Sequence, residues 1–592
     1  MAYFSAKQIQ TRPCTDKTFH DATHRYPPLI QRILAARGIH HSDELNFALK
    51  QLHPISSLKN VKAAAQLLAE AISHQQKILI VGDYDADGAT ATALCIRALH
   101  LCGHQAVDFL VPDRFKYGYG LTPAIVELAQ PYRPWLLMTV DNGVSSIEGV
   151  EAAQALGMKT LITDHHLPGQ QLPASDVMVN PNQPHDDFPS KALAGVGVAF
   201  YVMLALKQEL IAQGYFAKHS LPEPNLVSLL DLVALGTVAD VVPLDANNRI
   251  LVEQGLRRIR SGSAHAGIHA LLTIAKKDPN RVVSSDFGFA CGPRLNAAGR
   301  LADMGVGIRC LLTDDPKEAT RLALQLDSLN HDRRQIEADM KEDAEHIMQA
   351  LGFERQSKLP PIMCLHQADW HEGVVGILAS RLKDRYHRPV IVFANSEGGW
   401  LKGSGRCIEG LHLRDLIDEV ATQHPGMIQR FGGHAMAAGL TLAAEHFQQF
   451  QTSIIAAVNR QTQPDTFRET IYTDGGLTPS ELSLATAEQL QALAPWGQWF
   501  PEPQFEGEFE IKRLQILKDL HVKATLLPID AQAGYSLVSA VTALQFFADL
   551  DQWPTEGERV RIIYRLSVNE YRHERSLQLI VAYLLPNSAK AT

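Results

Sequence analysis

Several features that point to particular protein classes are missing from this sequence. The seven cysteines are scattered and odd in number, and none forms a Cys-x-x-Cys pair, so we expect a chain that works in a reducing compartment. The sequence has no signal-peptide start and no long uncharged apolar run. It also has no internal repeat and no low-complexity tract. We therefore expect a soluble, cytoplasmic protein with no membrane association.

An excess of positive charge is missing as well. The 55 Lys and Arg residues face 64 Asp and Glu residues, which gives a net charge of −9. Overall charge thus does not indicate a polyanionic partner, although a local basic groove can lie within an acidic total. The 25 histidines are mostly isolated, and His371-Glu372 lacks the second histidine that a zinc-protease helix needs. Charge neither favours nor excludes nucleic acid.

The length bounds the number of domains. A chain of 592 residues is too long for one hydrophobic core, so three or four domains are expected. A strongly helical, highly charged segment begins at Asp315-Pro316, and short alternating strands follow residue 470. The expected parts are a helical N-terminal segment at 1–60, a first α/β domain at 61–315, a connecting helix at 316–355, a second α/β domain at 356–462 and a barrel at 463–592.

One stretch places an apolar strand directly before three carboxylates. Lys77-Ile-Leu-Ile-Val-Gly82 predicts a buried parallel strand, and Asp83, Asp85 and Asp87 follow it. Ligands of open α/β sheets gather where strands end at their carboxyl edge, and hard divalent cations prefer carboxylate oxygen. Asp and Gly are also ordinary turn residues. Taken alone, the stretch indicates a turn and a metal loop equally.

The same pattern recurs along the chain. The strand expected at 135–140 runs into Asp141, and the strand at 160–163 runs into Asp164-His165-His166. Helical stretches such as 146–157 lie between the strands, so the alternation predicts an α/β fold with a doubly wound parallel sheet. Helix capping explains one Asp after a strand but not several acidic loops along one edge. The sequence therefore favours a metal site at this edge.

A long apolar stretch contains two further acids. Asp231 and Asp240 lie within residues 229–244, and buried acids need a partner or a metal. Either one can instead be a helix cap or part of a turn. Asp240 is the preferred metal ligand because it comes just before the break marked by Pro243. Asp231 is the second choice.

Anion-binding candidates follow in two regions. Arg294 and Arg300 flank a small-residue segment, and the arginine fork suits phosphate, although such arginines usually lie on a solvated turn. Farther on, 402–406 and 431–439 read as two glycine-rich loops, the second followed by a small-residue helix. Backbone N–H groups of consecutive glycines can converge on an anion. Two such loops, each with a cationic or imidazole side chain, favour phosphate binding.

The last region predicts a small barrel of the oligonucleotide-binding type, with strands near 505–511, 522–527, 559–566 and 577–583. The residues offered there for base stacking or phosphate contact are Trp496, Trp499, Phe500, His521, Lys523, Arg559, Arg561 and Arg565. Barrel core and solvated edges explain the same residues equally well.

The motifs in their order resemble the DHH phosphoesterase family. Asp83-Tyr-Asp-Ala-Asp-Gly, Asp141-Asn-Gly, Asp164-His-His and Leu235-Gly-Thr-Val-Ala-Asp240 carry the first part, and Gly403-Ser-Gly-Arg406 with Gly432-Gly-His434 resemble its associated domain. With the barrel, residues 60–585 resemble the single-strand-specific 5′ to 3′ DNA exonucleases of this family. Two departures are Trp499-Phe500 in place of the usual Gly-Asn, and Cys407 where Ser is common.

The resemblance implies a metal-dependent exonuclease that releases mononucleotides in DNA recombination and repair, using two Mn²⁺ or Mg²⁺ ions. The implied catalytic residues are Asp85, Asp87, Asp141, His165 and His166, and the implied metal ligands are Asp83, Asp85, Asp87, Asp141, His165 and Asp240. The implied substrate-binding residues are Arg294, Asn296, Arg300, His371, Ser404, Arg406, Gly432, Gly433 and His434. Imidazole among the ligands favours Mn²⁺ over Mg²⁺.

The implied partner is single-stranded DNA, with a single-strand-binding protein and a helicase as further candidates, and a monomer is favoured. Two alternatives are a hydrolase of short oligonucleotides or cyclic dinucleotides, and a replication scaffold that has lost catalysis. A barrel domain counts against the first because small substrates need no extended groove. Every carboxylate and histidine position is filled, which counts against the second.

Overall fold

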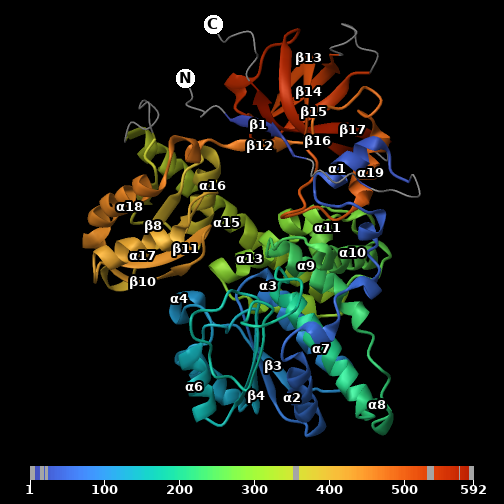
Figure 1. The fold of residues 1–592 in the computed structure, drawn as a ribbon, viewed down its shortest axis with the longest axis vertical. Coiled ribbons are helices and arrows are strands. Elements are labelled where there is room, and N and C mark those ends of the chain that lie inside the picture. The colour runs from blue at the N-terminus through green and yellow to red at the C-terminus, as the bar shows by residue number, and fades with distance from the viewer. Residues whose placement is uncertain are drawn as a thin grey trace. The chain divides into compact units, whose positions relative to one another are not determined.

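The computed structural model describes residues 7–13, 19, 25–350, 359–529, 539–571 and 574–585, and the chain forms two compact units (Figure 1). The large unit contains Thr11–Asp327 and Tyr472–Thr592, and the small unit contains Met1–Gln10 and Ser328–Ile471. The chain passes between the units within strand β1 (Gln8–Thr11), helix α15 (Pro316–Ala350) and strand β12 (Thr470–Thr473). The long helix predicted after Asp315 is thus confirmed as α15.

The large unit contains the predicted parallel sheet. Its strand order is β3-β2-β4-β5-β6, and all four pairings are parallel. The strands are β2 (Ile78–Gly82), β3 (Val107–Leu110), β4 (Leu136–Val140), β5 (Lys159–Thr163) and β6 (Val177–Val179). Every residue of β2 and β4 is buried, as expected for apolar strands covered on both faces. The three-residue edge strand β6 was not predicted, because it is too short to show a pattern.

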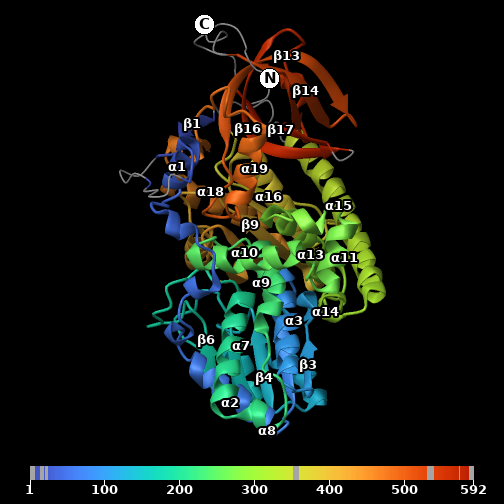
Figure 2. The ribbon, with the colours of Figure 1, turned by 90° about the vertical axis from the view of Figure 1, so that its right-hand side faces the viewer.

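Helices cover both faces of this sheet, which confirms the doubly wound fold. On one face, Leu79 of β2 and Leu137 of β4 share a core with Ile125 of α5 (Pro123–Ala129) and Val150 of α6 (Ile147–Ala155). Figure 2 shows α2 (Val61–Ser73), α3 (Ala86–Leu101) and α7 (Gly195–Ala212) gathered on the other face. Helices follow β2, β3, β4 and β6, whereas β5 runs to the neighbouring β6 without a helix between them.

Helix α7 is long and apolar enough to cross a membrane by length and composition. Within the protein, 67% of its apolar window is buried against the rest of the chain. Its glycines and alanines lie in the packed layer with α2, α3 and α9 (Leu230–Ala239). We therefore interpret α7 as a helix of the packed core of the large unit.

The large unit contains further helices before, within and after the sheet region. Their bounds are α1 (Pro28–Ala35), α4 (Arg114–Tyr117), α8 (Tyr215–Lys218), α10 (Ala246–Arg260), α11 (Ala266–Ile274), α12 (Ser284–Asp286), α13 (Gly292–Leu301) and α14 (Gly305–Leu312). A five-residue π-helix, Phe287–Cys291, leads directly into α13. The segment that carries Arg294 and Arg300 is therefore helical.

The predicted barrel is confirmed as a closed five-stranded barrel in the order β13-β14-β15-β17-β16. Its strands are β13 (Phe505–Leu517), β14 (His521–Pro528), β15 (Val541–Gln545), β16 (Arg559–Tyr571) and β17 (Glu574–Leu585), and α19 (Leu484–Leu493) precedes them. The strand β15 was not predicted. Alternating buried positions such as Phe505, Phe509 and Ile511 fill the interior.

The small unit has a mixed sheet in the order β10-β11-β9-β8-β7. Its strands are β7 (Met363–His366), β8 (Val390–Ser396), β9 (Trp400–Arg406), β10 (Ile428–Gly433) and β11 (Ala437–Ala443). Its other helices are α16 (Val375–Tyr386), α17 (Leu413–Gln423) and α18 (Phe447–Gln461). The prediction of two glycine-rich loops was wrong, because 402–406 lies in β9 and 431–439 forms the β10–β11 hairpin.

Close packing explains some of these glycines. A Cβ on Gly403 would lie 2.5 Å from a ring carbon of Phe393, and one on Gly405 would lie 2.6 Å from a methyl group of Leu413. Both glycines alternate with partly exposed residues along β9, so they let the strand approach the core. The helix predicted behind the second segment is β11, which pairs with β9 residue by residue.

Candidate metal centre

The acidic loop joins β2 to α3. Asp85 is the N-cap of α3, and its Oδ1 accepts hydrogen bonds from the N–H groups of Asp87 (3.0 Å) and Gly88 (2.9 Å). Asp83 Oδ1 accepts the N–H of Tyr84 at 2.8 Å. The loop is therefore both a helix cap and a cluster of carboxylates, so the turn and metal interpretations are compatible.

The carboxylate of Asp87 faces the first turn of α7. Its Oδ2 accepts the N–H of Gly195 at 2.7 Å and its Oδ1 accepts the N–H of Val196 at 2.9 Å. Asp87 is fully buried. N–H groups in the first turn of a helix have no acceptor within the helix, so Asp87 supplies one. These hydrogen bonds and the positive end of the helix dipole offset part of the cost of burying the Asp87 charge.

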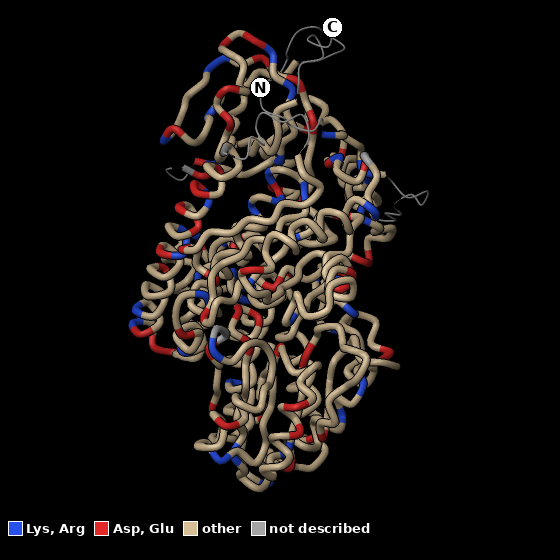
Figure 3. The backbone as a smooth tube through the Cα atoms, turned by 90° about the vertical axis from the view of Figure 1, so that its left-hand side faces the viewer, with Lys and Arg blue, Asp and Glu red and all other residues tan. Residues whose placement is uncertain are grey.

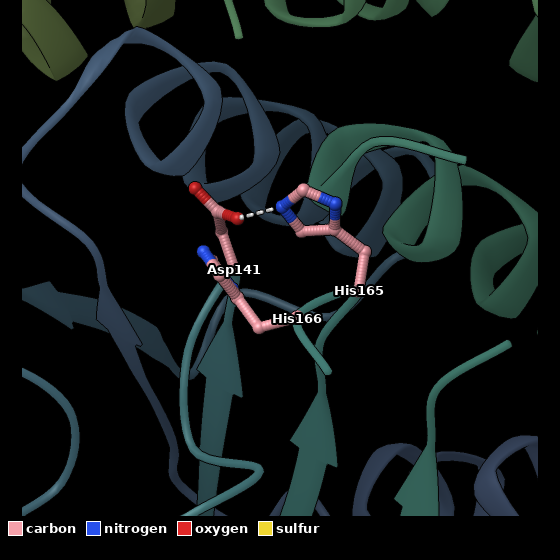
Figure 4. A group of neighbouring side chains, drawn as sticks. All are labelled: Asp141, His165 and His166. Atoms are coloured by element: carbon pink, nitrogen blue, oxygen red, sulfur yellow. Dashed lines mark ion pairs between the residues drawn. The ribbon is translucent and has the colours of Figure 1, made fainter. Parts of the chain in front are cut away.

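Asp141 follows β4 in the left-handed region, with φ of 63°. Its Oδ1 lies 3.1 Å from Nε2 of His165 (Figure 4). The same nitrogen lies 3.5 Å from Oδ2 of Asp240. A Cβ on Gly195 would lie 2.6 Å from the same Asp141 oxygen. Gly195 therefore leaves the space that the Asp141 carboxylate occupies.

Asp164 holds the His-His segment after β5. Its Oδ1 accepts the N–H of His165 (2.7 Å) and lies 2.8 Å from Nδ1 of His166, and its Oδ2 accepts the N–H of Val144 (2.8 Å). This buried carboxylate is committed to hydrogen bonds that orient its neighbours. Its role matches the carboxylate partner that commonly fixes a ligating histidine.

Three residues around this segment were missed by sequence reasoning. The hydroxyl of Tyr119 lies 3.2 Å from Nδ1 of His166. The side-chain amides of Asn180 and Asn182 donate to the carbonyl oxygens of His166 (2.9 Å) and His165 (2.6 Å). The segment Asn180-Pro-Asn182 comes directly after a short strand. It is the local signal that could have indicated a turn whose asparagine side chains form hydrogen bonds with the backbone.

These side chains form three overlapping groups that could each hold a metal ion, with ligand atoms within 4.8 Å of one another in each group. The groups are Asp83 with Asp85 and Asp141, Asp87 with His165 and Asp240, and Asp141 with His165 and His166. The buried Asp141 Oδ1 accepts no hydrogen bond from the residues that the structure describes. Carboxylate and imidazole donors with an unsatisfied buried oxygen fit Mn²⁺ or Mg²⁺.

Burial and mutual repulsion perturb the acids of the centre. Burial and the nearby charge of Asp85 raise the pKa of Asp87 to about 7. Burial and the charges of Asp87 and Asp85 also raise the pKa values of Asp141 and Asp240 well above their ordinary range. So many acids crowded together are stable in the charged form only beside cations.

The structure separates the two acids of the apolar stretch. Asp240 is the C-cap of α9 and belongs to a group with Asp87 and His165 that could hold a metal ion. Asp231 lies in the first turn of α9, where its carboxylate accepts the N–H groups of Leu232 (3.0 Å) and His265 (2.8 Å). The His265 ring nitrogen Nδ1 lies 2.8 Å from the same carboxylate. Asp231 therefore has a structural partner.

Helix α13 packs directly on the acidic loop. Asn296 Oδ1 accepts the N–H of Ala86 at 2.8 Å, and a Cβ on Gly299 would lie 1.8 Å from the Tyr84 carbonyl oxygen. Arg294 forms an ion pair with Asp327 at 2.7 Å and donates to the Ala290 carbonyl at 2.7 Å. Asn296 and Arg294, expected at the substrate, thus have internal hydrogen-bonding roles.

In the small unit, the structure brings Ser404 and Arg406 to the start of α16. Arg406 Nη1 donates to Ser404 Oγ at 3.3 Å, and a Cβ on Gly376 would lie 2.9 Å from that oxygen. His371 Nδ1 accepts the N–H of Gly373 at 3.0 Å. The positions of the remaining candidates follow: Gly432 and Gly433 end β10, His434 begins the hairpin turn to β11, and Arg300 lies in the last turn of α13.

The aromatic residues before the barrel were expected to offer stacking surfaces, and two of them do not. Phe500 is fully buried and stacks on Trp496 at 5.0 Å with ring planes 13° apart. Arg249 covers Phe500 at 4.4 Å. Only Trp499 among the three is largely exposed, at 75%. The rings of Trp496 and Phe500, which the sequence suggested for base stacking, therefore take part instead in packing between the segment before the barrel and α10.

The barrel cations are also paired internally. Arg559, Arg561 and Arg565 face Glu508 (3.8 Å), Glu506 (2.8 Å) and Glu502 (2.6 Å). Figure 3 shows Lys and Arg interspersed with Asp and Glu along the described part of the chain. The barrel strands thus carry balanced charge rather than a stripe of one sign.

Comparison with known proteins identifies three consecutive family regions. The N-terminal domain of the DHH family matches residues 77–237, the DHHA1 domain matches 359–460 and the RecJ OB domain matches 473–583. The single-stranded-DNA-specific exonuclease RecJ of Dickeya dadantii is 47% identical over 580 residues, covering 98% of this chain and 99% of the relative. That of Escherichia coli is 46% identical over 581 residues, covering 98% and 100%.

Solved structures agree with these matches. Thermus thermophilus RecJ in complex with Mn²⁺ superposes with a TM-score of 0.77 at 26% identity, covering 98% of this chain and 80% of that chain. The Mg²⁺ complex gives a TM-score of 0.72 at 25% identity, covering 98% and 79%.

Proposed function

The chain belongs to the RecJ family of DHH phosphoesterases, and we propose that it digests single-stranded DNA from the 5′ end and releases mononucleotides during recombination and repair. It is a metal-dependent exonuclease that uses Mn²⁺ or Mg²⁺. The observation that carries the proposal is the meeting of three strand ends and the end of α9 in one cluster of acids and histidines.

We assign Asp83, Asp85 and Asp141 to one ion, and Asp87, His165 and Asp240 to the other. Asp141 would help to hold both ions, because it belongs to the first group and its Oδ1 lies 3.1 Å from Nε2 of His165 in the second. When bound, the ions lower the pKa of the attacking water and neutralise charge that develops on the phosphate. The imidazole ligand favours Mn²⁺.

His166 has a separate part in this proposal. Burial lowers its pKa, but the hydrogen bond and charge of Asp164 outweigh burial and raise the pKa to about 9. Asp164 also fixes the ring orientation through Nδ1, beside the Tyr119 hydroxyl. In the metal-free protein the ring is therefore protonated at neutral pH, and a positive charge held beside Asp141 can attract the anionic phosphate.

Phosphate binding at other positions is assigned to the small unit. Ser404, Arg406 and the first turn of α16 lie together, and this arrangement supports an anion-binding role that also involves His371, Gly432, Gly433 and His434. For Arg294 and Arg300 we retain a role near the substrate, with Asn296 holding the loop. A single-strand-binding protein and a helicase are proposed partners of a cytoplasmic, monomeric enzyme.

The test compares single-stranded and duplex DNA labelled at the 5′ or 3′ end, in Mn²⁺. We expect immediate release of labelled mononucleotide only from the 5′ end of single strands. Asp141→Asn should reduce release at least 1000-fold, roughly the effect of removing a group essential to the chemistry. Asn tolerates the left-handed backbone at this position, so the fold should be kept. Asp187→Asn, at an exposed acid, is the matched control.

Immediate release from the 3′ end, or equal digestion of duplex DNA, would contradict the proposal. Hydrolysis limited to two- or three-nucleotide substrates would instead favour the short-oligonucleotide alternative. Wild-type activity of the Asp141→Asn variant would contradict the assignment of this cluster as the metal centre.

A further inference from the structure

A cavity of about 410 Å³ lies beside the acidic loop, within the large unit. Its described lining comes from the loop, from the chain after β3 and from the junction of α13 and α14. The lining residues are Tyr84, Val111, Pro112, Asp113, Gly299, Leu301, Ala302, Asp303 and Met304. None of these side chains is among the candidate metal ligands.

Contacts between aromatic rings link the wall of the cavity to the metal centre. Tyr84 lies between Asp83 and Asp85 in the chain, and its ring meets that of Tyr119 edge to face at 6.1 Å. The Tyr119 ring in turn meets the ring of His166 at 5.7 Å. A ligand that fills the cavity therefore touches the loop that carries two of the candidate metal ligands.

The walls suit a flat, mostly apolar group. Tyr84 offers an aromatic ring, and Val111, Pro112, Leu301 and Met304 add apolar and polarizable surface. Stacking on such side chains stabilises nucleobases, whatever their identity, because every base has a π-face. The cavity is thus large enough for one base, and its lining has the chemistry to stack on it.

The charges at the cavity disfavour a phosphate group. Among the described lining residues, the charged side chains are the carboxylates of Asp113 and Asp303. Asp303 Oδ1 accepts the N–H of Gly305 at 2.8 Å, and its other oxygen lies 3.6 Å from Arg309. Carboxylates can accept hydrogen bonds from the exocyclic amino groups of bases, but repel phosphate oxygens.

We propose that this cavity is a nucleobase subsite in which Tyr84 stacks on the base of a nucleotide next to the scissile phosphate. The proposal rests on the exonuclease function given above and assigns Tyr84 a positioning role. Because the same loop carries Asp83 and Asp85, base stacking holds the substrate in register with the metal centre. The contact is tolerant of sequence, with a preference for bases that carry an amino group.

The experiment uses single-stranded oligonucleotides that carry one abasic residue at the first, second or third position from the end that the wild-type enzyme digests. We expect kcat/KM of the wild type to fall roughly 10-fold at one of these positions, the order that loss of one stacked base gives. Tyr84→Ala should lose about the same factor on the intact strand and show no further loss on the abasic strand. Tyr84→Phe keeps the aromatic ring, so its kcat/KM should still be lower on the abasic strand than on the intact strand.

A second pair of variants tests the cavity without changing the acidic loop. Ala302 lies exposed at the C-cap of α13 and lines the cavity. Ala302→Phe should fill the cavity and abolish the difference in kcat/KM between intact and abasic strands. Ala302→Ser should leave that difference unchanged. Tyr132→Ala, at an exposed tyrosine after α5, is the matched control and should behave as wild type. The Mn²⁺ concentration for half-maximal activity should be unchanged in Ala302→Phe.

Full discrimination between intact and abasic strands in both Tyr84→Ala and Ala302→Phe would overturn the subsite while leaving the exonuclease assignment intact. A wild-type enzyme that shows no loss at any abasic position would do the same. A wild-type enzyme that releases no nucleotide from single-stranded DNA would instead overturn the proposed function, and the subsite with it.

Discussion

The side-chain oxygen of Asn296 accepts a hydrogen bond from the N–H of Ala86 at 2.8 Å, so a residue in α13 holds a loop that lies 210 positions earlier in the chain. Ala86 lies between Asp85 and Asp87, the two acids of the loop assigned to different ions. The position of both carboxylates thus depends on α13.

Asn296→Ala should weaken metal binding more than it weakens the fold. Loss of the hydrogen bond frees the loop and should raise the Mn²⁺ concentration for half-maximal activity roughly 10-fold, as for other groups that orient metal ligands. Stability should fall by about 1 kcal/mol. Metal titration of activity and denaturant unfolding measure the two effects. Asn280→Ala, at an exposed asparagine, should change neither metal response nor activity.

Gly299→Ala should displace the acidic loop directly. Its Cβ would lie 1.8 Å from the Tyr84 carbonyl oxygen, and a backbone atom cannot move aside without moving Asp83 and Asp85. We expect kcat/KM to fall by at least about 10-fold, which is roughly 1.4 kcal/mol of transition-state stabilisation. Gly288→Ala is the control, because the nearest atom to its Cβ would be 3.7 Å away. Equal activity of the two variants would contradict the packing argument.

The acids of the centre should make metal-free stability fall as pH rises. The pKa of Asp87 is raised from 3.8 to about 7, so between these values the folded protein binds more protons than the unfolded chain. Its contribution to stability is therefore present at low pH and is lost as pH rises through about 7. Mn²⁺ needs the deprotonated form, so metal binding should strengthen over the same range.

Thermal unfolding from pH 5.5 to pH 8, with EDTA or with Mn²⁺, measures both trends. The difference in Tm between the two conditions should widen as pH rises. A constant difference would show that the carboxylates are already charged at pH 5.5. Asp141→Asn, which removes one charge from the cluster, should narrow the difference at every pH.

Trp499→Gly should be tolerated or stabilising. Trp499 is 75% exposed and adopts φ of 61°, a conformation that costs a non-glycine residue about 1–2 kcal/mol. The larger unfolded-state entropy of glycine offsets roughly 0.5–1 kcal/mol of the gain. Trp496→Gly is the contrast, because Trp496 stacks on buried Phe500 and its loss should cost about 3 kcal/mol or more. Denaturant unfolding compares the two.

Local patterns predicted the sheet well because its strands are fully buried. Continuous apolar runs such as Ile78–Gly82 must be covered on both sides, and parallel strands must end at one edge. Asp83, Asp141 and Asp164 follow such runs directly, so their convergence followed from the chain order. Asp240 was preferred over Asp231 only because Pro243 lies near it, which is a weak signal. The structure supports this preference by placing Asp240 in a group that could hold a metal ion.

Short or glycine-rich elements were the ones that local patterns missed. Gly403 and Gly405 suggested an anion-binding loop, yet they lie in β9 because Phe393 and Leu413 require close approach. Glycine permits both arrangements, and only the neighbouring side chains distinguish them. Phe500 illustrates the same limit, since exposure of an aromatic ring depends on what packs against it.

The sequence by itself determined the parallel sheet, the acidic edge and the family, because these follow from hydrophobic runs and from motifs that are local in the chain. Only the tertiary structure decided which polar groups reach that edge from elsewhere. Tyr119, Asn296 and Gly195 act on the centre through contacts across long stretches of chain. Such contacts depend on how the helices pack, and no spacing between residues in the sequence encodes that packing.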